Sequence, residues 1–191
     1  MDFRSHRKSI LFGAAAESAV EKGYSYMFNK SILCAICAQQ GKTCCVGTDI
    51  FVTPGDVRRI AAFTSNHDFY EFRSSSIPSY RDQSDDPVWD TLVFRSDGTR
   101  RVIKHSSSGA CLFLDPQGCR LPISVRPLVC RLHPHIYNAQ GLYPGLAPDC
   151  PINLLPIGNN LEMAIAGFSN EEAMNWHHLL YEEIKEKGDE P

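Results

Sequence analysis

The sequence has no apolar run long enough to cross a bilayer as a helix. Such a span needs about 18 consecutive apolar residues, and polar or charged residues interrupt every stretch of this 191-residue chain earlier than that. Basic stripes that would bind nucleic acid and basic blocks that would tether the chain to a membrane are also missing. We therefore predict neither a nucleic-acid nor a membrane partner, while the identity of any protein partner stays open.

Cysteine is too sparse for a small scaffold held together by disulfides. The chain has eight cysteines, below the density of roughly 8–10% that is typical of such scaffolds. With 43% hydrophobic residues it can bury a core of its own. We predict a single domain over residues 1–191, in which the cysteines serve a purpose other than stapling the fold.

The N-terminal residues have the basic start of a secretion signal but not its apolar length. The run from Ile10 to Ala16 is at the short end of what signal peptides use, and Glu17 interrupts it. We predict instead an amphipathic helix over residues 8–30 and a cytoplasmic location. In a reducing compartment, clustered cysteines are more often metal ligands or redox groups than disulfide partners.

Local signals predict two further helices. Thr53 is a good N-cap, Pro54 fits the first helical position and Asp56 follows three residues after the cap. A C-terminal helix is predicted over residues 169–187, where Ser169 and Glu172 form a capping box. Its apolar residues fall on one face that we expect to be buried: Ala173, Trp176, Leu180 and Ile184.

Turn sequences between strand-like runs predict hairpins. Asp97-Gly98 suits a tight turn joining two strands within residues 88–105, and residues 111–121 contain a second reversal. Residues 50–52 have the composition of a short strand, and residues 73–87 and 138–160 that of loops. The predicted fold class is α+β: a small antiparallel sheet or hairpins with two to four helices and long loops, organised around a cysteine-ligated metal site within residues 33–150.

The eight cysteines form two groups along the chain. They are Cys34, Cys37, Cys44 and Cys45, then Cys111, Cys119, Cys130 and Cys150. A C-x2-C spacing lets one short turn point two thiolates at the same ion. We predict that Cys34 and Cys37 lie on such a loop or short turn. Four thiolates suit either zinc or an iron–sulfur cluster such as 4Fe–4S, and eight cysteines provide two such sets.

The adjacent pair Cys44-Cys45 restricts the arrangement, because neighbouring side chains of an extended segment point to opposite faces. Both thiolates can bind one ion only if the backbone turns there; otherwise one of them faces the core or a second metal. In the second group, Cys111 and Cys119 flank the predicted reversal and are expected to approach each other across its base.

Other interpretations stand beside metal binding. A lone buried cysteine usually acts as a small hydrophobe, and a thioredoxin-like role for Cys34 and Cys37 needs a βαβ context that the sequence does not show. His133 and His135 suit either a zinc site with three thiolates or a hydrogen-bonded loop. The pair His177-His178 is expected at the surface or the core edge.

Three arginines accompany the second cysteine group: Arg120, Arg126 and Arg131. Positive charge there would lower the pKa of the thiols and offset the negative charge of a thiolate-bound centre. The alternative is that they are ordinary surface arginines, and the sequence favours neither.

The segment CLFLDPQGCRLPISVRPLVCRLHP, taken with CAICAQQGKTCC upstream, resembles the YkgJ-type cysteine-cluster (CxxCxxCC) family of zinc- or iron-chelating domains. The family pattern falls on Cys34, Cys37, Cys44, Cys45, Cys111, Leu114, Cys119, Arg126, Pro127, Cys130 and Arg131. Here six residues, rather than the usual two, separate Cys37 from Cys44; the cost of closing such a loop grows slowly with its length. The motif is also similar to a cysteine-rich part of flagellin lysine N-methylases, which implies an iron–sulfur cluster.

We predict a metal-binding protein whose eight cysteines hold zinc or iron and so join the two cysteine groups. One alternative is a metal- or cluster-dependent redox or group-transfer enzyme, in which a coordination position stays open for substrate. Another is an interaction module that docks a partner on an exposed C-terminal stripe. The number of protein ligands separates the first two, and burial of the stripe would count against the third.

Overall fold

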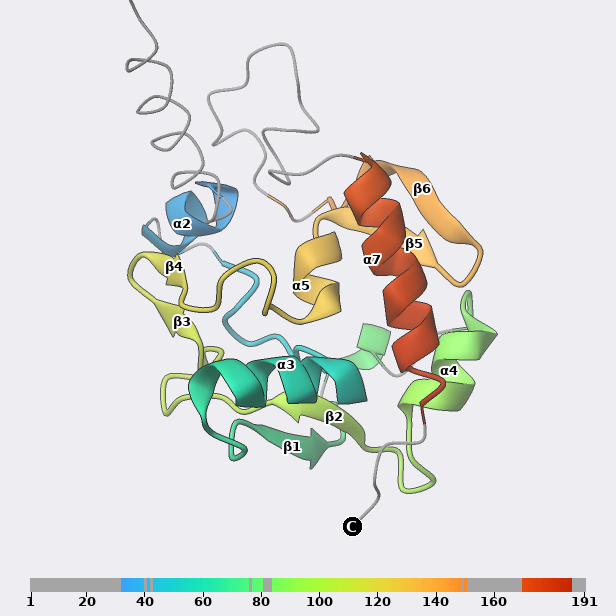
Figure 1. The fold of residues 1–191 in the computed structure, drawn as a ribbon, viewed down its shortest axis with the longest axis horizontal. Helices are drawn as coiled ribbons and strands as arrows, with labels where there is room; N and C mark the ends of the chain where they lie inside the picture. Colours follow the sequence, from blue (N-terminus) through green and yellow to red (C-terminus); the bar gives the residue numbers. More distant parts are fainter. Residues whose placement is uncertain are drawn as a thin grey trace, which may run out of the picture.

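The computed structural model describes residues 32–39, 41, 43–75, 77–80, 84–148, 150 and 170–186. These residues contain five α-helices and three two-stranded antiparallel sheets (Figure 1). The α+β class is confirmed, although the helices exceed the predicted two to four. No helix in this described part of the chain is long and apolar enough to cross a membrane. The predictions for residues 8–30 and Ser169 lie outside the described residues.

The elements follow one another in short pieces. In chain order they are α2 (Ile32–Gln39), α3 (Pro54–Thr64), β1 (Tyr70–Arg73), the 3-10 turn η1 (Pro78–Tyr80), α4 (Pro87–Val93), β2 (Arg100–Ile103), β3 (Leu114–Asp115), β4 (Gly118–Cys119), α5 (Leu128–Leu132), β5 (His135–Asn138), β6 (Gly141–Leu146) and α7 (Asn170–Glu183). β1 pairs with β2, β3 with β4, and β5 with β6.

The start of α3 confirms the capping prediction. Thr53 Oγ1 accepts a hydrogen bond from Asp56 N at 2.9 Å, and the Asp56 carboxylate accepts one from Thr53 N at 3.1 Å. Pro54 occupies the first turn, where its missing N–H is not needed. This reciprocal pair satisfies two of the free N–H groups at the helix start.

Strand β2 is paired on both edges. Tyr70 of β1 lies opposite Ile103, and on the other edge Val52 N donates to Arg101 O at 3.1 Å. The predicted extended segment at residues 50–52 is therefore confirmed as a β-type partner of β2, through an isolated bridge at Phe51. Helix α3 packs over this region (Figure 1). The first hydrophobic core lies there: Ile50, Val52, Ile60, Ala61, Phe69, Ile103, Cys111, Phe113 and Leu121.

The predicted hairpin over residues 88–105 is wrong in its first arm, which forms α4. Asp86 caps this helix by accepting a hydrogen bond from Trp89 N at 3.0 Å, and Pro87 stands in the first turn. Trp89 and Val93, four residues apart, bury one face. The turn itself is present, with Gly98 at φ +75°, but it joins a helix to β2.

The predicted loop over residues 138–160 is wrong in its first part, where β5 and β6 form a hairpin. Ile136 lies opposite Tyr143, and Asn138 opposite Gly141. Asn138 Oδ1 accepts a hydrogen bond from Gln140 N at 2.9 Å, which stabilises the turn. Residues 151–160 lie outside the described part of the chain.

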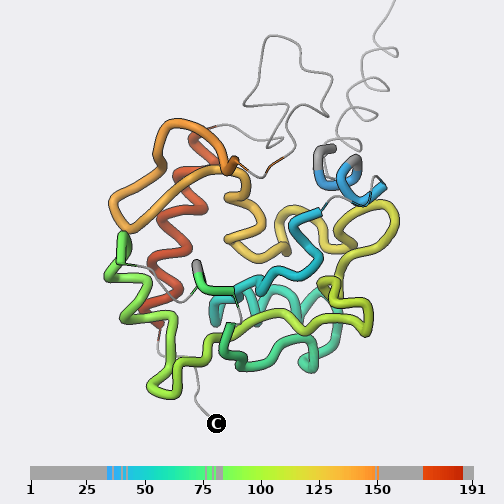
Figure 2. Tube along the Cα trace, turned by 180° about the vertical axis from the view of Figure 1, so that it is seen from behind, coloured from blue at the N-terminus to red at the C-terminus, as the bar shows by residue number. Residues whose placement is uncertain are grey.

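Helix α7 packs against α5 and beside β6, and both views show α5 between α2 and α7 (Figures 1 and 2). The predicted stripe is confirmed as buried at Ala173, Leu180 and Ile184, and Trp176 is half-buried. A second core forms there: Phe51, Trp89, Val93, Leu128, Leu132, Leu180, Tyr181 and Ile184. Burial of this stripe counts against the interaction-module hypothesis.

Candidate metal centre

Cys34 and Cys37 lie on helix α2, not on the predicted loop. Residues 32–39 contain neither Gly nor Pro, and Gly41, at φ +66°, follows with its N–H bonded to Ala38 O at 3.2 Å. On a helix, residues three apart share a face. The C-x2-C spacing therefore still places both thiols on the same side, as a shared ligand role requires.

Helix α2 approaches the β3–β4 hairpin through a glycine. A Cβ atom on Gly118 would lie 3.2 Å from Ala35 Cα and 3.3 Å from Ala35 N, and Gly118 has φ +102°. Only glycine combines that backbone conformation with so close a backbone neighbour. The contact brings Cys34 beside the strand that ends in Cys119 (Figure 1).

Gly118→Ala should therefore weaken the metal centre as well as the fold. We expect a loss of about 1–3 kcal/mol in unfolding free energy, from the positive φ and from the forced separation of α2 and β4. Gly98→Ala is the matched control, because Gly98 also has positive φ but open space around it. Denaturant titration and metal analysis of both variants test this prediction. If the two variants lose the same stability and bind the same amount of metal, the contact of Gly118 with Ala35 has no effect on the metal centre.

A backbone ladder joins the two cysteine groups. Cys111 N donates to Cys45 O at 2.7 Å, Gly47 N donates to Gly109 O at 3.0 Å, and Val46 and Ala110 form an antiparallel bridge. Cys45 and Cys111 are thus held side by side by main-chain hydrogen bonds.

The remaining cysteines of the second group reach this region from separate elements. The predicted reversal is confirmed as the β3–β4 hairpin, in which Leu114 lies opposite Cys119. Cys130 lies on α5, and Cys150 ends a turn in which its N–H donates to Ala147 O at 3.0 Å. Figure 2 shows the chain after α2 (cyan) running beside α5 (gold).

Cys44 and Cys45 lie on a backbone turn and interact with each other. The Cys44 thiol donates a hydrogen bond to Cys45, which lowers the pKa of Cys45 to about 6; the Thr43 hydroxyl and the Arg126 charge act in the same direction. The same hydrogen bond, together with burial, raises the pKa of Cys44. Cys45 is therefore the thiol best suited to be a thiolate near neutral pH.

Burial is the main influence on the pKa of five of the other thiols. It raises the pKa of Cys111 to about 12 and that of Cys150 to about 11, and it also raises the pKa of Cys37, Cys119 and Cys130. Neighbouring cysteines add to these shifts: Cys45 and Cys119 act on Cys130, and Cys37 and Cys34 act on Cys150. The thiols of both groups thus lie within electrostatic reach of one another.

All eight cysteines are free thiols. Cys111 belongs to the first hydrophobic core, and three more cysteines pack against it: Cys45, Cys119 and Cys130. Within the described residues, however, no three or more His, Cys, Asp or Glu side chains have an arrangement that would hold a metal ion. The donor chemistry fits zinc or iron, and a closed site requires the thiols to turn toward a common point.

The three arginines near the second group differ in their roles. Arg126 is buried and its Nε donates to Leu121 O at 2.9 Å. Its charge helps to lower the pKa of Cys45, and it partly opposes the rise that burial causes in the pKa of Cys119. Arg131 is buried as well, but it donates to the carbonyls of Arg126 and Ser124. Arg120 is exposed and donates to Leu112 O. The predicted lowering of a thiol pKa is therefore found for Arg126 at Cys45, while the offset of the charge of a metal centre stays a prediction.

The histidines take no part in a described metal group. Burial and the neighbouring His135 lower the pKa of His133, which favours its neutral form. His177 is buried, with Nε2 2.7 Å from Asn138 O, and His178 is exposed.

Asp56 has a second role that the sequence did not reveal. Its carboxylate lies 3.1 and 3.3 Å from Leu128 N, the first residue of α5, and 2.6 Å from Arg59 Nη2. Glu183 of α7 completes the group by accepting hydrogen bonds from Arg59 and Thr53. Asp56 thereby fixes the short helix that carries Cys130.

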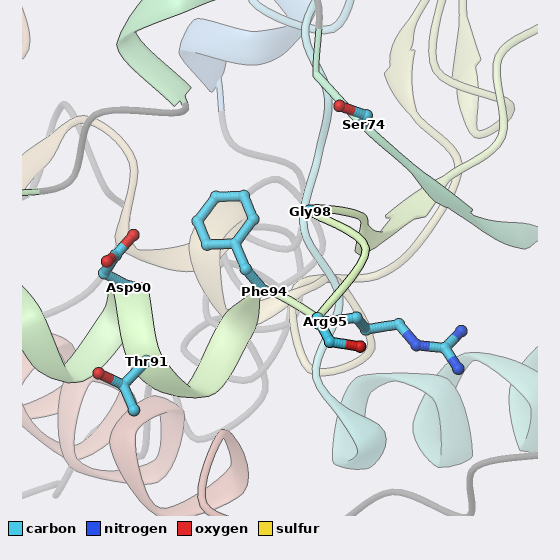
Figure 3. A pocket seen from close by; sticks show the side chains of 7 residues that line it. Ser74, Asp90, Thr91, Phe94, Arg95 and Gly98 are labelled. Atoms are coloured by element: carbon cyan, nitrogen blue, oxygen red, sulfur yellow. The ribbon is translucent and has the colours of Figure 1, made fainter.

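A cavity of about 660 Å3 lies away from the cysteines, between the end of α4 and the turn before β2. In Figure 3, Asp90, Thr91 and Phe94 come from the α4 side and Gly98 from the turn, and the Arg95 guanidinium points away from Asp90. None of the described residues that line it is a cysteine or histidine. It is therefore no part of the metal centre.

Comparison with protein families gives one match. Residues 33–151 match the CxxCxxCC family, described as "Putative zinc- or iron-chelating domain". The match covers well over half of the 191 residues, so the chain belongs to this family, and the resemblance inferred from the sequence is confirmed. Metal chelation is the activity that this family supports. Searches of curated proteins and of solved structures find no match.

Proposed function

We propose that the cysteines of this chain hold zinc or iron, and that the metal joins α2, the Cys44-Cys45 turn, the β3–β4 hairpin and α5. One observation carries the proposal: free thiols from segments far apart in sequence meet in one region. The Cys45–Cys111 ladder and the Gly118 contact bring them there. Bound metal would cross-link these segments, since ligation energy in structural sites also stabilises the fold.

We assign the thiols to two ligand sets, with their packing as support. The proposed inner set is Cys45, Cys111, Cys119 and Cys130, which belong to the first core or pack against it. The outer set, Cys34, Cys37, Cys44 and Cys150, comes from α2, the turn after it and the turn at Ala147. Each set has the four thiolates that a zinc ion or a 4Fe–4S cluster takes.

Purification without oxygen, followed by metal analysis and absorption spectroscopy, tests this proposal. Broad visible absorption with iron and inorganic sulfide would identify an iron–sulfur cluster, and a colourless protein with stoichiometric zinc would identify zinc. A sample treated with a strong chelator provides the baseline. Protein that carries neither metal, and takes up neither on reconstitution, would overturn the proposal. Three protein ligands with one open position would favour the enzyme alternative instead.

A further inference from the structure

Cys44 and Cys45 occupy the two central positions of a tight turn. Val46 N donates to Thr43 O at 3.3 Å, which closes the turn around the two cysteines. Thr43 Oγ1 also accepts a hydrogen bond from Cys45 N at 3.1 Å. In an extended segment the two cysteine side chains would point to opposite faces. Because the chain turns here, that obstacle to a contact between neighbouring side chains is absent.

The two thiols on this turn are in contact with each other. The Cys44 thiol donates a hydrogen bond to the Cys45 sulfur. This contact places the two sulfur atoms next to each other, which is where they must lie before a bond between them can form. The turn therefore presents a dithiol as well as two proposed metal ligands.

Cys44 is also the cysteine that a small molecule in solution can reach. It is exposed, although neighbouring groups desolvate its thiol in part, whereas each of the other seven cysteines is half-buried or buried. The turn around it is open, since Val46 is 48% exposed and a Cβ atom on Gly47 would meet nothing within 4 Å. By contrast, Cys37 of the C-x2-C pair is only 6% exposed. Thiol–disulfide exchange depends on such access.

A disulfide between these adjacent cysteines would be easy to reduce again. Consecutive Cα atoms lie about 3.8 Å apart across a trans peptide, whereas the Cα atoms of a disulfide are usually about 4.4–6.8 Å apart. The bridge would therefore be strained, and strained or exposed disulfides are the labile and regulatory ones. The pair suits a reversible switch better than a permanent cross-link.

The two cysteines belong to different proposed ligand sets. Cys45 lies in the inner set, where its carbonyl oxygen accepts the hydrogen bond from Cys111 N, and Cys44 lies in the outer set. One bridge between them would withdraw one thiolate from each set at the same time. Each set would then lack the fourth ligand that closes a structural site.

We propose that a low-molecular-weight disulfide of the glutathione type oxidises Cys44 and Cys45 to a reversible disulfide, and that this reaction releases metal from both sets. The Cys44 sulfur bonds to one sulfur of the oxidant, and one thiol leaves. The Cys45 sulfur then bonds to the Cys44 sulfur and displaces the second thiol. The protein loses two electrons and two protons, which the two released thiols carry away. The release of metal rests on the proposed function, whereas the dithiol chemistry does not.

Peptide mass mapping of the full-length, chelator-treated protein tests the bridge. After incubation with oxidised glutathione, we expect the peptide that carries Cys44 and Cys45 to lose two hydrogens, and reduced glutathione to restore them. Cys34→Ser is the control, because it removes the neighbour of Cys37 but keeps the pair on the turn, so it should lose the same two hydrogens. A bridge between Cys34 and Cys37 instead, or glutathione adducts without any bridge, would overturn the inference.

Cys44→Ser and Cys150→Ser separate oxidative release from the loss of a ligand. Each variant lacks one thiol of the outer set, but only Cys44→Ser lacks the pair. Under oxidised glutathione, the metal that each variant retains should leave Cys44→Ser at least about tenfold more slowly than Cys150→Ser. Equal release rates would overturn the regulatory role. If the protein carries no metal and the bridge forms, the proposed function fails while the mapped bridge still supports the redox pair.

Discussion

Cys130→Ser is expected to remove metal from the inner set and to lower the free energy of unfolding of the metal-loaded protein. If the whole site is lost, the effect is on the order of 10 kcal/mol, which is the contribution of a structural zinc site. Cys130 is the only cysteine of α5 and packs against the first core, so in the proposed inner set it is the link to this helix. Metal analysis and denaturant unfolding of the loaded protein measure both effects.

Measuring the same variant after metal removal separates the loss of a metal ligand from the change in side-chain packing. After chelation, wild type and Cys130→Ser should unfold within about 1–2 kcal/mol of each other, because only a small buried side chain differs. Val129→Thr is a neighbouring control: Val129 is half-buried on the same short helix and has no ligand atom. It should keep its metal. Full metal content in Cys130→Ser would remove Cys130 from the ligand set.

Asp56→Ala has the second large expected effect. The substitution removes a fully buried carboxylate that caps α3, bonds to the first N–H of α5 and pairs with Arg59. We expect a loss of about 3–5 kcal/mol in unfolding free energy, as for other broken buried ion pairs. Because α5 carries Cys130, metal affinity should fall as well. Chemical denaturation and competition with a metal chelator measure the two effects.

Asp90→Ala is the matched control for Asp56→Ala. Asp90 is also in the first turn of a helix, but it is exposed. Its replacement should change stability by at most about 0.5 kcal/mol and leave metal affinity unchanged. If Asp56→Ala destabilises the protein but binds metal like wild type, Asp56 supports the fold and does not position Cys130.

The sequence predicted those elements whose signals are local. The capping box at Thr53 and Asp56, the turn at Gly98 and the buried face of α7 each depend on residues a few positions apart. Propensity and periodicity report such relations directly.

The prediction failed where similar local signals fit two structures. Residues 88–93 are apolar enough for a strand, but Asp86 and Pro87 start a helix there, and burial of Trp89 and Val93 stabilises it. Strand β1 was missed because its pairing with β2 joins residues about thirty positions apart. Tertiary pairing of this kind overrides local strand propensity.

For the metal centre, the sequence supplied the donor atoms but not their arrangement. Eight cysteines could be named, and the CxxCxxCC resemblance was correct. The ladder between Cys45 and Cys111, the close approach at Gly118 and the second role of Asp56 are long-range contacts. No spacing rule along the chain indicates them.

The attachment of Cys45 to Cys111 differs in kind from the attachment of Cys34 to Cys119. Main-chain hydrogen bonds hold the first pair, whereas the second depends on a van der Waals approach at Gly118. If the proposed metal is removed, the Cys45–Cys111 pair should therefore keep its arrangement, because its main-chain hydrogen bonds do not depend on the metal. The position of Cys34 beside Cys119 should depend more strongly on the bound metal.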